Sequence, residues 1–334
     1  MNEEKKQLDV LAIGDIVIDA FIKLKDAEVE CEVDKTNCKL CMAFGQKIPY
    51  ESVEICNAVG NSGNAAVSVA RLGLNSAILT YVGNDQNGKD CLVELERNNV
   101  STAFIHTVDD KKTNYHYVLW YYVDRTILVK HEVFDYKLGD IGLPKWIYLS
   151  SLGEKSFEMY KQISNYLSQH TEIKLAFQPG VFDMKLGKEK LDFIYKHADA
   201  VCVNVEESQS ILKESSRDLK TLLKGMVALG SKTVFITDGF DGAYAYDNNR
   251  PEDFWFMPIY PHVPYERTGA GDAFFSTVVS CLAMDKSLDE ALSWGPINSM
   301  SVVQYVGAQK GLLSREKLEE YLKNAPVDYK PRKI

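Results

Sequence analysis

The chain has 334 residues, of which 46% are hydrophobic and 25% are charged, a composition typical of globular proteins. Its 38 basic and 47 acidic residues leave a net charge of −9, which argues against a nucleic-acid binder because such proteins need a basic surface. No apolar run approaches the roughly 18 residues of a membrane span, and the N-terminus lacks the apolar core of a signal peptide. The seven cysteines form no dense framework for so long a chain, so we expect a cytoplasmic protein.

In chain order, residues 8–22 read as a first buried strand that continues into more chain of strand type. Residues 23–56 are polar and cysteine-bearing, with little helical period. A helix of small residues follows at 60–74, then a strand at 76–85 and an amphipathic helix at 89–100. Residues 114–134 are rich in aromatic and β-branched side chains, which predicts a pair of strands.

From residue 146 onward the chain alternates between strands and helices, which implies a parallel sheet covered on both faces. We expect strands at 146–152, 174–180, 200–205, 232–239 and 242–247, and helices at 158–170, 190–198, 208–214, 218–230 and 288–307. Two segments of strand type, 16–56 and 104–130, break this alternation, and we interpret them as a small β-lid inserted into the core. The core then comprises residues 1–15, 57–103 and 131–330, and residues 331–334 are a polar tail.

The most informative motif is TGAGDAFFS at residues 268–276, where two glycines and an aspartate precede an apolar helical stretch. A helix N-terminus carries unpaired N–H groups and binds anions, and glycines let a ligand approach the backbone. Asp272 could simply cap the helix, as aspartates often do. It could instead take a proton from a nucleophile that attacks a phosphoryl group held at this site. Taken alone, the motif favours neither interpretation.

Three further motifs complete a pattern, namely GNSGNAAVSVARLG at 60–73, NVEE at 204–207 and TDGFDG at 237–242. With GAGD at 269–272, they resemble in order and spacing the ribokinase-like carbohydrate kinases, also called the PfkB family. The resemblance implies a doubly wound α/β fold, with a mostly parallel sheet flanked by helices and a β-lid. It also implies phosphoryl transfer from ATP, with Mg²⁺, to a hydroxyl of a small acceptor. Asp272 would be the base, and Gly269, Ala270 and Gly271 would form the anion hole.

The resemblance assigns the nucleotide to a second group of residues. Asn204 and Glu207 would organise Mg²⁺ and the phosphates, with Glu207 acting on the metal through water, which suits a strongly hydrated ion. The alternative is a capping box at a solvated helix start. Thr237, Gly239 and Gly242 would lie against the phosphates or else form an ordinary turn. Asn298 would line the adenine pocket or else satisfy its buried neighbours.

The acceptor is expected on the amino-terminal side of the chain. Relatives bind sugar hydroxyls with acidic groups after the first strand, which here are Asp15 and Asp19, and carboxylates accept the hydrogen bonds that polyols donate. The alternatives are a turn former for Asp15 and a lid surface charge for Asp19, with Asp19 the better candidate. Gly60, Asn61 and Asn64 would complete the pocket. Arg125 either points from the lid into the site or is an exposed arginine at a strand end.

We favour ribose or another free sugar as acceptor. A nucleoside is the alternative, since lid aromatics such as Tyr117, Trp120 and Tyr121 could stack on a base, although aromatic strand residues are more often core or interface. No dense Lys/Arg cluster appears near the acceptor side, which argues mildly against a sugar phosphate. The rival of another class is a non-catalytic sugar- or nucleotide-binding regulatory protein on the same fold.

The chain departs from the family at Glu266-Arg267, where relatives usually carry Asp-Thr that helps shape a monovalent-cation site. Glu266 could substitute for the aspartate, or Arg267 could replace the charge of the cation, so activation by K⁺ stays open. Exposed apolar lid strands favour a homodimer formed through the lid.

Three other patterns resemble known binding motifs. The run at 83–90 resembles a P-loop but has Asp90 where Ser or Thr is needed. GAGDAF lacks the third glycine of a dinucleotide fingerprint. Cys31, Cys38, Cys41 and Cys56 could bind a structural zinc, but their spacing matches no common zinc knuckle, and free thiols are the favoured interpretation.

Overall fold

The structure is a computed structural model that describes residues 7–31, 38–122 and 124–334. Its centre is a ten-stranded sheet in the order β16-β15-β14-β13-β12-β11-β10-β1-β6-β7. All neighbours from β7 to β13 are parallel, and β14, β15 and β16 add an antiparallel edge. The strands of this sheet are β1 (Val10–Ile13), β6 (Ser76–Gly83), β7 (Val100–Val108), β10 (Trp146–Ser150), β11 (Lys174–Gln178), β12 (Ala198–Asn204), β13 (Thr233–Thr237), β14 (Ala243–Asp247), β15 (Phe254–Met257) and β16 (Arg332–Lys333).

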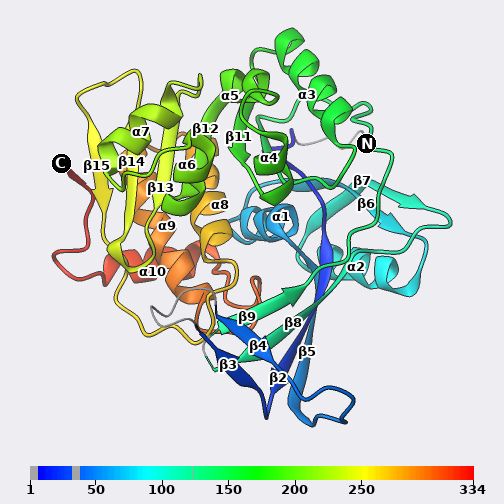
Figure 1. The fold of residues 1–334 in the computed structure, drawn as a ribbon. Helices are drawn as coiled ribbons and strands as arrows, with labels where there is room; N and C mark the ends of the chain where they lie inside the picture. The colour runs from blue at the N-terminus through cyan, green and yellow to red at the C-terminus, as the bar shows by residue number, and fades with distance from the viewer. Residues whose placement is uncertain (1–6, 32–37, 123) are drawn as a thin grey trace.

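Helices cover both faces of this sheet (Figure 1). One face packs against α1 (Asn61–Arg71), α2 (Gln86–Arg97), α8 (Ala270–Ala283), α9 (Leu288–Val302) and α10 (Arg315–Lys323). The other packs against α3 (Phe157–Gln169), α5 (Asp192–His197), α6 (Val205–Leu212) and α7 (Leu219–Val227), and α4 (Val181–Leu186) follows β11. Successive residues of β1 enter opposite cores, because side chains alternate across a strand. The sequence-based prediction of a doubly wound, mostly parallel sheet is therefore confirmed.

A second sheet of four strands, in the order β5-β2-β8-β9, forms the lid (Figure 1). Its strands are β2 (Val17–Leu24), β5 (Tyr50–Val59), β8 (Tyr115–Tyr121) and β9 (Asp124–Leu128). The expected strand pair is the antiparallel hairpin β8-β9. The boundary predicted at residue 104 cuts through β7, whose pairing with β6 in the large sheet continues to Val108. Likewise β5 continues as a lid strand beyond residue 56, to Val59.

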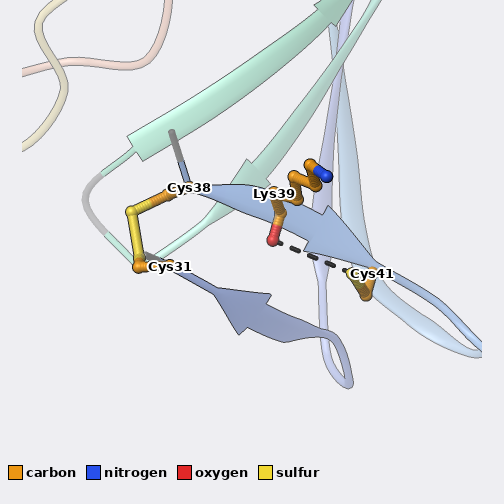
Figure 2. The surroundings of a disulfide bond; sticks show 4 residues. All are labelled: Cys31, Cys38, Lys39 and Cys41. Carbon is orange, nitrogen blue, oxygen red and sulfur yellow. Dashed lines mark hydrogen bonds between the residues drawn. A yellow bond between two sulfur atoms is a disulfide. The ribbon is translucent and has the colours of Figure 1, made fainter. Parts of the chain in front are cut away.

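The lid also carries a small hairpin, β3 (Glu28–Glu30) with β4 (Lys39–Cys41), whose cysteines were misjudged from the sequence. Cys31 and Cys38 form a disulfide, and the Cys41 thiol points back to the Lys39 carbonyl (Figure 2). Cys56 lies instead in the lid's own apolar cluster. Within the described ranges no cluster of three or more metal-ligating side chains exists. The zinc hypothesis is therefore wrong, and so is the expectation that Cys31 and Cys38 are free thiols.

Local sequence signals missed several elements, among them α4, α10, β15 and β16. Helix α4 has only six residues, too few for a clear helical period. It matters for the site because it buries Asp183 near Asp15. Among the described residues, every helix falls short of the length and apolarity needed to cross a bilayer.

Candidate active site

Asp272 lies in the first turn of α8, two residues after the start of the helix at Ala270. Gly269, the residue immediately before Ala270, has a φ of 79°. This dihedral favours glycine because a side chain is strained there. A Cβ at Gly269 would also lie 2.4 Å from the Cβ of Ala308. Glycine is therefore required twice at this position, by the backbone dihedral and by the close approach of the neighbouring loop.

The carboxylate of Asp272 is held by three side-chain amides that come from distant parts of the chain. Asn61 Nδ2 donates to Oδ1 at 2.8 Å, Asn64 Nδ2 donates to Oδ2 at 2.7 Å, and Gln178 Nε2 donates to Oδ1 at 3.0 Å. Burial raises the pKa of Asp272, and the hydrogen bonds from these amides oppose that rise. The N-cap of α8 is Gly269, so the interpretation of Asp272 as a simple cap is wrong. The carboxylate is oriented, half-buried and basic.

Asn61 and Asn64 were expected to line the acceptor pocket, and in the structure their side chains are hydrogen-bonded to Asp272. Both lie in the first turn of α1, where Gly60 is the N-cap with a φ of 98°. Gln178, at the end of β11, was missed from the sequence because nothing in its local pattern marks it. Its side-chain oxygen accepts a hydrogen bond from the Tyr148 hydroxyl, which fixes the amide with its N–H₂ group toward Asp272.

The sequence predicts an anion site at the start of α8. Ala270, Gly271 and Asp272 occupy the first turn, whose backbone N–H groups have no partner within the helix, and Gly271 is exposed. The Ala270 carbonyl accepts a hydrogen bond from Ser299 Oγ at 2.8 Å, which ties this turn to α9. A phosphoryl group bound here would meet the positive end of the α8 dipole.

Asp15 is a buried carboxylate directly after β1. Its Oδ2 accepts hydrogen bonds from the Tyr136 hydroxyl at 2.7 Å and from the Gly153 N–H at 2.8 Å. Burial raises the pKa of Asp15 to about 7, with the Asp183 charge adding to the rise and the two hydrogen bonds opposing it. Asp15 is thus more than a turn former, since a group poised near neutral pH in a buried site is a functional candidate.

Two histidines that the sequence did not single out lie beside these carboxylates, with His116 next to Asp19 of β2 and His131 Nδ1 3.9 Å from Asp15 Oδ2. His116 Nδ1 lies 3.3 Å from Asp19 Oδ1, and the His116 and His131 rings lie 5.0 Å apart. Burial, helped by His116, lowers the pKa of His131 to about 4. Four buried polar atoms here have no hydrogen-bond partner in the described chain: Asp15 Oδ1, Asp19 Oδ1, His116 Nε2 and His131 Nδ1. Unpaired buried groups are costly, and these four atoms have hydrogen-bonding capacity left for a ligand.

The first turn of α1 connects this polar cluster to Asp272. Ser62 Oγ donates to the Asp15 carbonyl at 2.9 Å, and a Cβ at Gly60 would lie 3.0 Å from that same oxygen. Asn61 and Asn64, in the same turn, reach Asp272. One short segment therefore contacts both the proposed acceptor cluster and the proposed base, and it fixes their relative positions.

Arg125, on β9, contacts the loop before α8. Its Nη1 lies 2.9 Å from Glu266 Oε1, so it is not a free arginine at a strand end. Its partner is a loop carboxylate, and the structure gives it no contact with Asp15 or Asp19. The neighbouring Arg267 lies with its guanidinium 5.1 Å from the centre of the Phe240 ring.

A cavity of about 180 Å³ opens on the other side of the α8 N-terminus. Thr237, Gly239 and Gly242, which the sequence predicts to lie against the phosphates, line it together with Ala270 and Gly271. Its remaining walls are mostly apolar and include Phe240, Ile259, His262, Pro264, Pro296 and Val303. An apolar slot that ends at an anion site has the form needed for a planar base with attached phosphates.

Asn204 and Glu207 form a reciprocal capping box at the start of α6. Glu207 N donates to Asn204 Oδ1 at 2.7 Å, and Asn204 N donates to Glu207 Oε2 at 2.8 Å. Burial raises the pKa of Glu207, the bond from Asn204 lowers it, and the charge of Asp272 raises it further. The capping interpretation is correct, and it leaves Glu207 Oε1 available near Asp272.

Asn298 does not line the cavity, contrary to the expectation from the sequence. It is fully buried, donates to Thr277 Oγ1 at 2.8 Å and accepts from the Leu313 N–H at 2.9 Å. Its amide satisfies neighbours in the core, and Pro296 and Ser299 of the same helix line the cavity in its place.

Comparisons with known proteins agree with this geometry. The pfkB family carbohydrate kinase pattern matches residues 45–315. The chain is 23% identical over 324 residues to an ATP-dependent 6-phosphofructokinase of Thermoanaerobacterium thermosaccharolyticum, covering 91% of each protein. It is 26% identical to a ribokinase of Bacillus subtilis, covering 79% of this chain and 87% of that protein.

Solved structures show the same fold at lower sequence identity. The Arabidopsis thaliana ribokinase complexed with ribose and ATP superposes with a TM-score of 0.77 at 17% identity, covering 95% of this chain and 99% of that one. A Methanocaldococcus jannaschii nucleoside kinase superposes with a TM-score of 0.74 at 16% identity, with the same coverage. Since the family match spans most of the sequence, this chain belongs to the pfkB family of carbohydrate kinases and is a phosphotransferase.

Proposed function

We propose that the protein transfers the γ-phosphoryl group of Mg·ATP to a hydroxyl of a small free sugar, with Asp272 as the base. The observation that carries this proposal is the Asp272 carboxylate, held by three amides at an anion-binding helix start. On one side of that helix start lies the apolar cavity. On the other lies the polar cluster around Asp15 and Asp19, reached through the first turn of α1.

In the proposed step, Asp272 removes the proton of the acceptor hydroxyl while the hydroxyl oxygen forms a bond to the γ-phosphorus. The bond from that phosphorus to the β–γ bridging oxygen breaks, and its electron pair leaves with ADP. Burial raises the pKa of Asp272, which makes the carboxylate a stronger base, and the amide bonds keep it ionised and aimed. The N–H groups of the first turn of α8 oppose the charge that develops on the phosphoryl oxygens.

The polar cluster supports a neutral polyol as acceptor. Asp15 and Asp19 offer oxygens to hydroxyl donors, and His116 and His131 offer ring nitrogens with unused hydrogen-bonding capacity. A ribose-like sugar matches this chemistry. A nucleoside is the alternative acceptor, because His131 and Phe182 make an edge-to-face contact at 5.3 Å that could border a base. A non-catalytic binding role is disfavoured by the oriented Asp272.

Glu207 is our candidate for Mg²⁺, through bound water. One oxygen of its carboxylate is free of the capping box, and Mg²⁺ favours carboxylate oxygens while keeping several waters. Bound Mg²⁺ would neutralise phosphate charge. We expect no activation by K⁺, because Glu266 already has a cationic partner in Arg125.

We also propose a homodimer through the lid. Strand register places Ile55 and Tyr117 opposite Ala20, and Leu128 opposite Tyr117, so their side chains share one face of the lid sheet. Ile55 is 60% exposed, Tyr117 49% and Leu128 52%, and a row of exposed apolar side chains marks an interaction surface. Light scattering should show a dimer that Ile55→Glu converts to a monomer. A monomeric parent protein would contradict the proposal.

The kinase proposal is tested by ADP release from Mg·ATP with pentoses, hexoses, sugar phosphates and nucleosides, each with and without K⁺. We expect a free sugar to stimulate release. Asp272→Asn should lower turnover by about 100- to 10,000-fold while nucleotide binding, measured by calorimetry, is retained. Stimulation only by a nucleoside would select the alternative acceptor. ATP binding without stimulation by any acceptor would favour the binding-protein role.

A further inference from the structure

Arg125 belongs to the lid, yet its charged group is paired with a residue of the core. On β9 it lies opposite Trp120 of β8, and its Nη1 reaches Glu266 Oε1 at 2.9 Å. The side chain of Glu266 is 2% exposed and that of Arg125 is 29% exposed. The pair is therefore largely shielded from water. Removing one partner of a shielded ion pair costs far more free energy than removing one partner of a surface pair.

Glu266 is also part of the loop that leads into the anion site. Its Oε1 accepts hydrogen bonds from both Thr268 N, at 2.9 Å, and Thr268 Oγ1, at 2.6 Å. Thr268 directly precedes Gly269, the N-cap of α8. Oε2 is buried and has no partner in the described chain. One carboxylate thus organises the loop and depends on a lid residue for its counter-charge.

The rest of the lid contact supports the same docking. The Trp120 ring meets Tyr265 edge-to-face at 5.3 Å, and Phe21, Val118 and Trp120 pack with Val306 of the core. Asp19 and His116 of the acceptor cluster lie on the lid strands β2 and β8. Whatever binds that cluster therefore acts on the same sheet that carries Arg125.

We propose that Arg125 is a positioning residue that completes the phosphoryl site only when the lid is docked. This inference rests on the proposed function. Without Arg125, the buried charge of Glu266 would lie three residues before Gly269, the N-cap of α8, and would oppose an incoming phosphate. Arg267 does not fill this role, because its guanidinium lies over Phe240. Acceptor binding would close the lid, and lid closure would bring Arg125 to Glu266. Phosphoryl transfer would then proceed.

The experiment compares Arg125→Met, Glu266→Gln and the double variant, with Lys130→Met as a matched control. Lys130 lies two residues beyond β9 with a side chain 73% exposed. We expect Arg125→Met to lower kcat by about 100-fold, since it leaves a buried charge unpaired, with little change in the KM for ATP. The double variant should be no worse than Arg125→Met alone. Added guanidinium ion should restore part of the activity of Arg125→Met and leave Lys130→Met unchanged.

A second measurement does not depend on catalysis. Hydrogen exchange of the backbone should rise by about 10-fold or more in both residues 115–128 and residues 265–271 of Arg125→Met, and in neither segment of Lys130→Met. Exchange confined to one segment, or losses in kcat that simply multiply in the double variant, would overturn the inference. If the parent protein phosphorylates no acceptor, the proposed function fails, while the exchange result still decides whether Arg125 couples lid and loop.

Discussion

Asn64 donates a 2.7 Å hydrogen bond to Oδ2 of Asp272, although 208 residues separate them in the chain. The amide is itself oriented, because Asn64 Oδ1 accepts a hydrogen bond from Gln309 Nε2 at 3.2 Å. The amide hydrogen therefore points at the carboxylate. Two signature motifs of the sequence, one at the start of α1 and one at the start of α8, meet in this contact.

Asn64→Ala should shift the pH profile of the kinase as well as slow it. The bond from Asn64 lowers the pKa of Asp272, so removing it raises that pKa and less of the base is ionised at a given pH. We expect the acidic limb of kcat/KM to move to higher pH by about one unit. Asn61→Ala should move it in the same direction. An unchanged profile in both variants would show that these amides do not act on the base.

Gly269→Ala should abolish most activity and destabilise the protein. The φ of 79° and the 2.4 Å approach to Ala308 both oppose a side chain, and strain of this kind costs about 1–3 kcal/mol. Adding Ala308→Gly removes the closest contact but leaves the Ala308 Cα at 2.8 Å and the dihedral strain, so the double variant should recover only part of the stability. Thermal unfolding and ADP release measure the two effects. A Gly269→Ala protein with full activity would contradict the anion-site geometry.

Asp15 should make stability depend on pH. Its pKa of about 7 lies above the ordinary value of 3.8, so as pH rises the unfolded chain loses this proton first. Protonated Asp15 contributes on the order of 4 kcal/mol to the free energy of unfolding below about pH 4. This contribution is lost progressively as the pH rises to about 7. Asp15→Asn should lack this decline.

The comparison for Asp15 must be made variant against parent at each pH, by urea unfolding. His131 contributes the opposite slope, because its pKa is lowered from 6.5 to about 4 and stability from that group is lost as pH falls through this range. Equal pH dependence in parent and Asp15→Asn would show that folding does not raise the pKa of Asp15.

Phe240→Ala should weaken nucleotide binding selectively. Phe240 lines the apolar cavity and packs under Arg267. Losing an aromatic wall should raise the KM for ATP by about 10-fold, with the KM for the acceptor nearly unchanged. Tyr321→Ala, at an aromatic residue outside the cavity lining, is the control. A larger effect on the acceptor than on ATP would place the nucleotide elsewhere.

Alkylation of denatured protein should count five free thiols before reduction and seven after it, because Cys31 and Cys38 are paired. Mass spectrometry of the alkylated protein gives the count. The pair is on an exposed hairpin of the lid, so a reducing agent should open it without unfolding the core. Seven free thiols in protein purified without reductant would contradict the pairing.

Much of the architecture followed from local pattern. The alternation of apolar strands and amphipathic helices from residue 146 onward predicted the parallel sheet, because strand and helix periods differ and are visible in short windows. The start of α8, with Gly269 as its N-cap, could be predicted for the same reason. Glycine and aspartate before an apolar run are local signals of a helix start. Short elements such as α4 escaped detection because one and a half turns carry little period.

The sequence by itself thus determined the layers of the fold and the family, and it predicted the anion site and the base that we propose. Only the tertiary structure decided how that base is held and charged. The amide of Gln178, the pairing of Arg125 with Glu266 and the burial of Asp15 against Tyr136 all join residues more than 90 positions apart. Such contacts arise when segments far apart in the chain pack together, and local propensity carries no record of which side chains then meet.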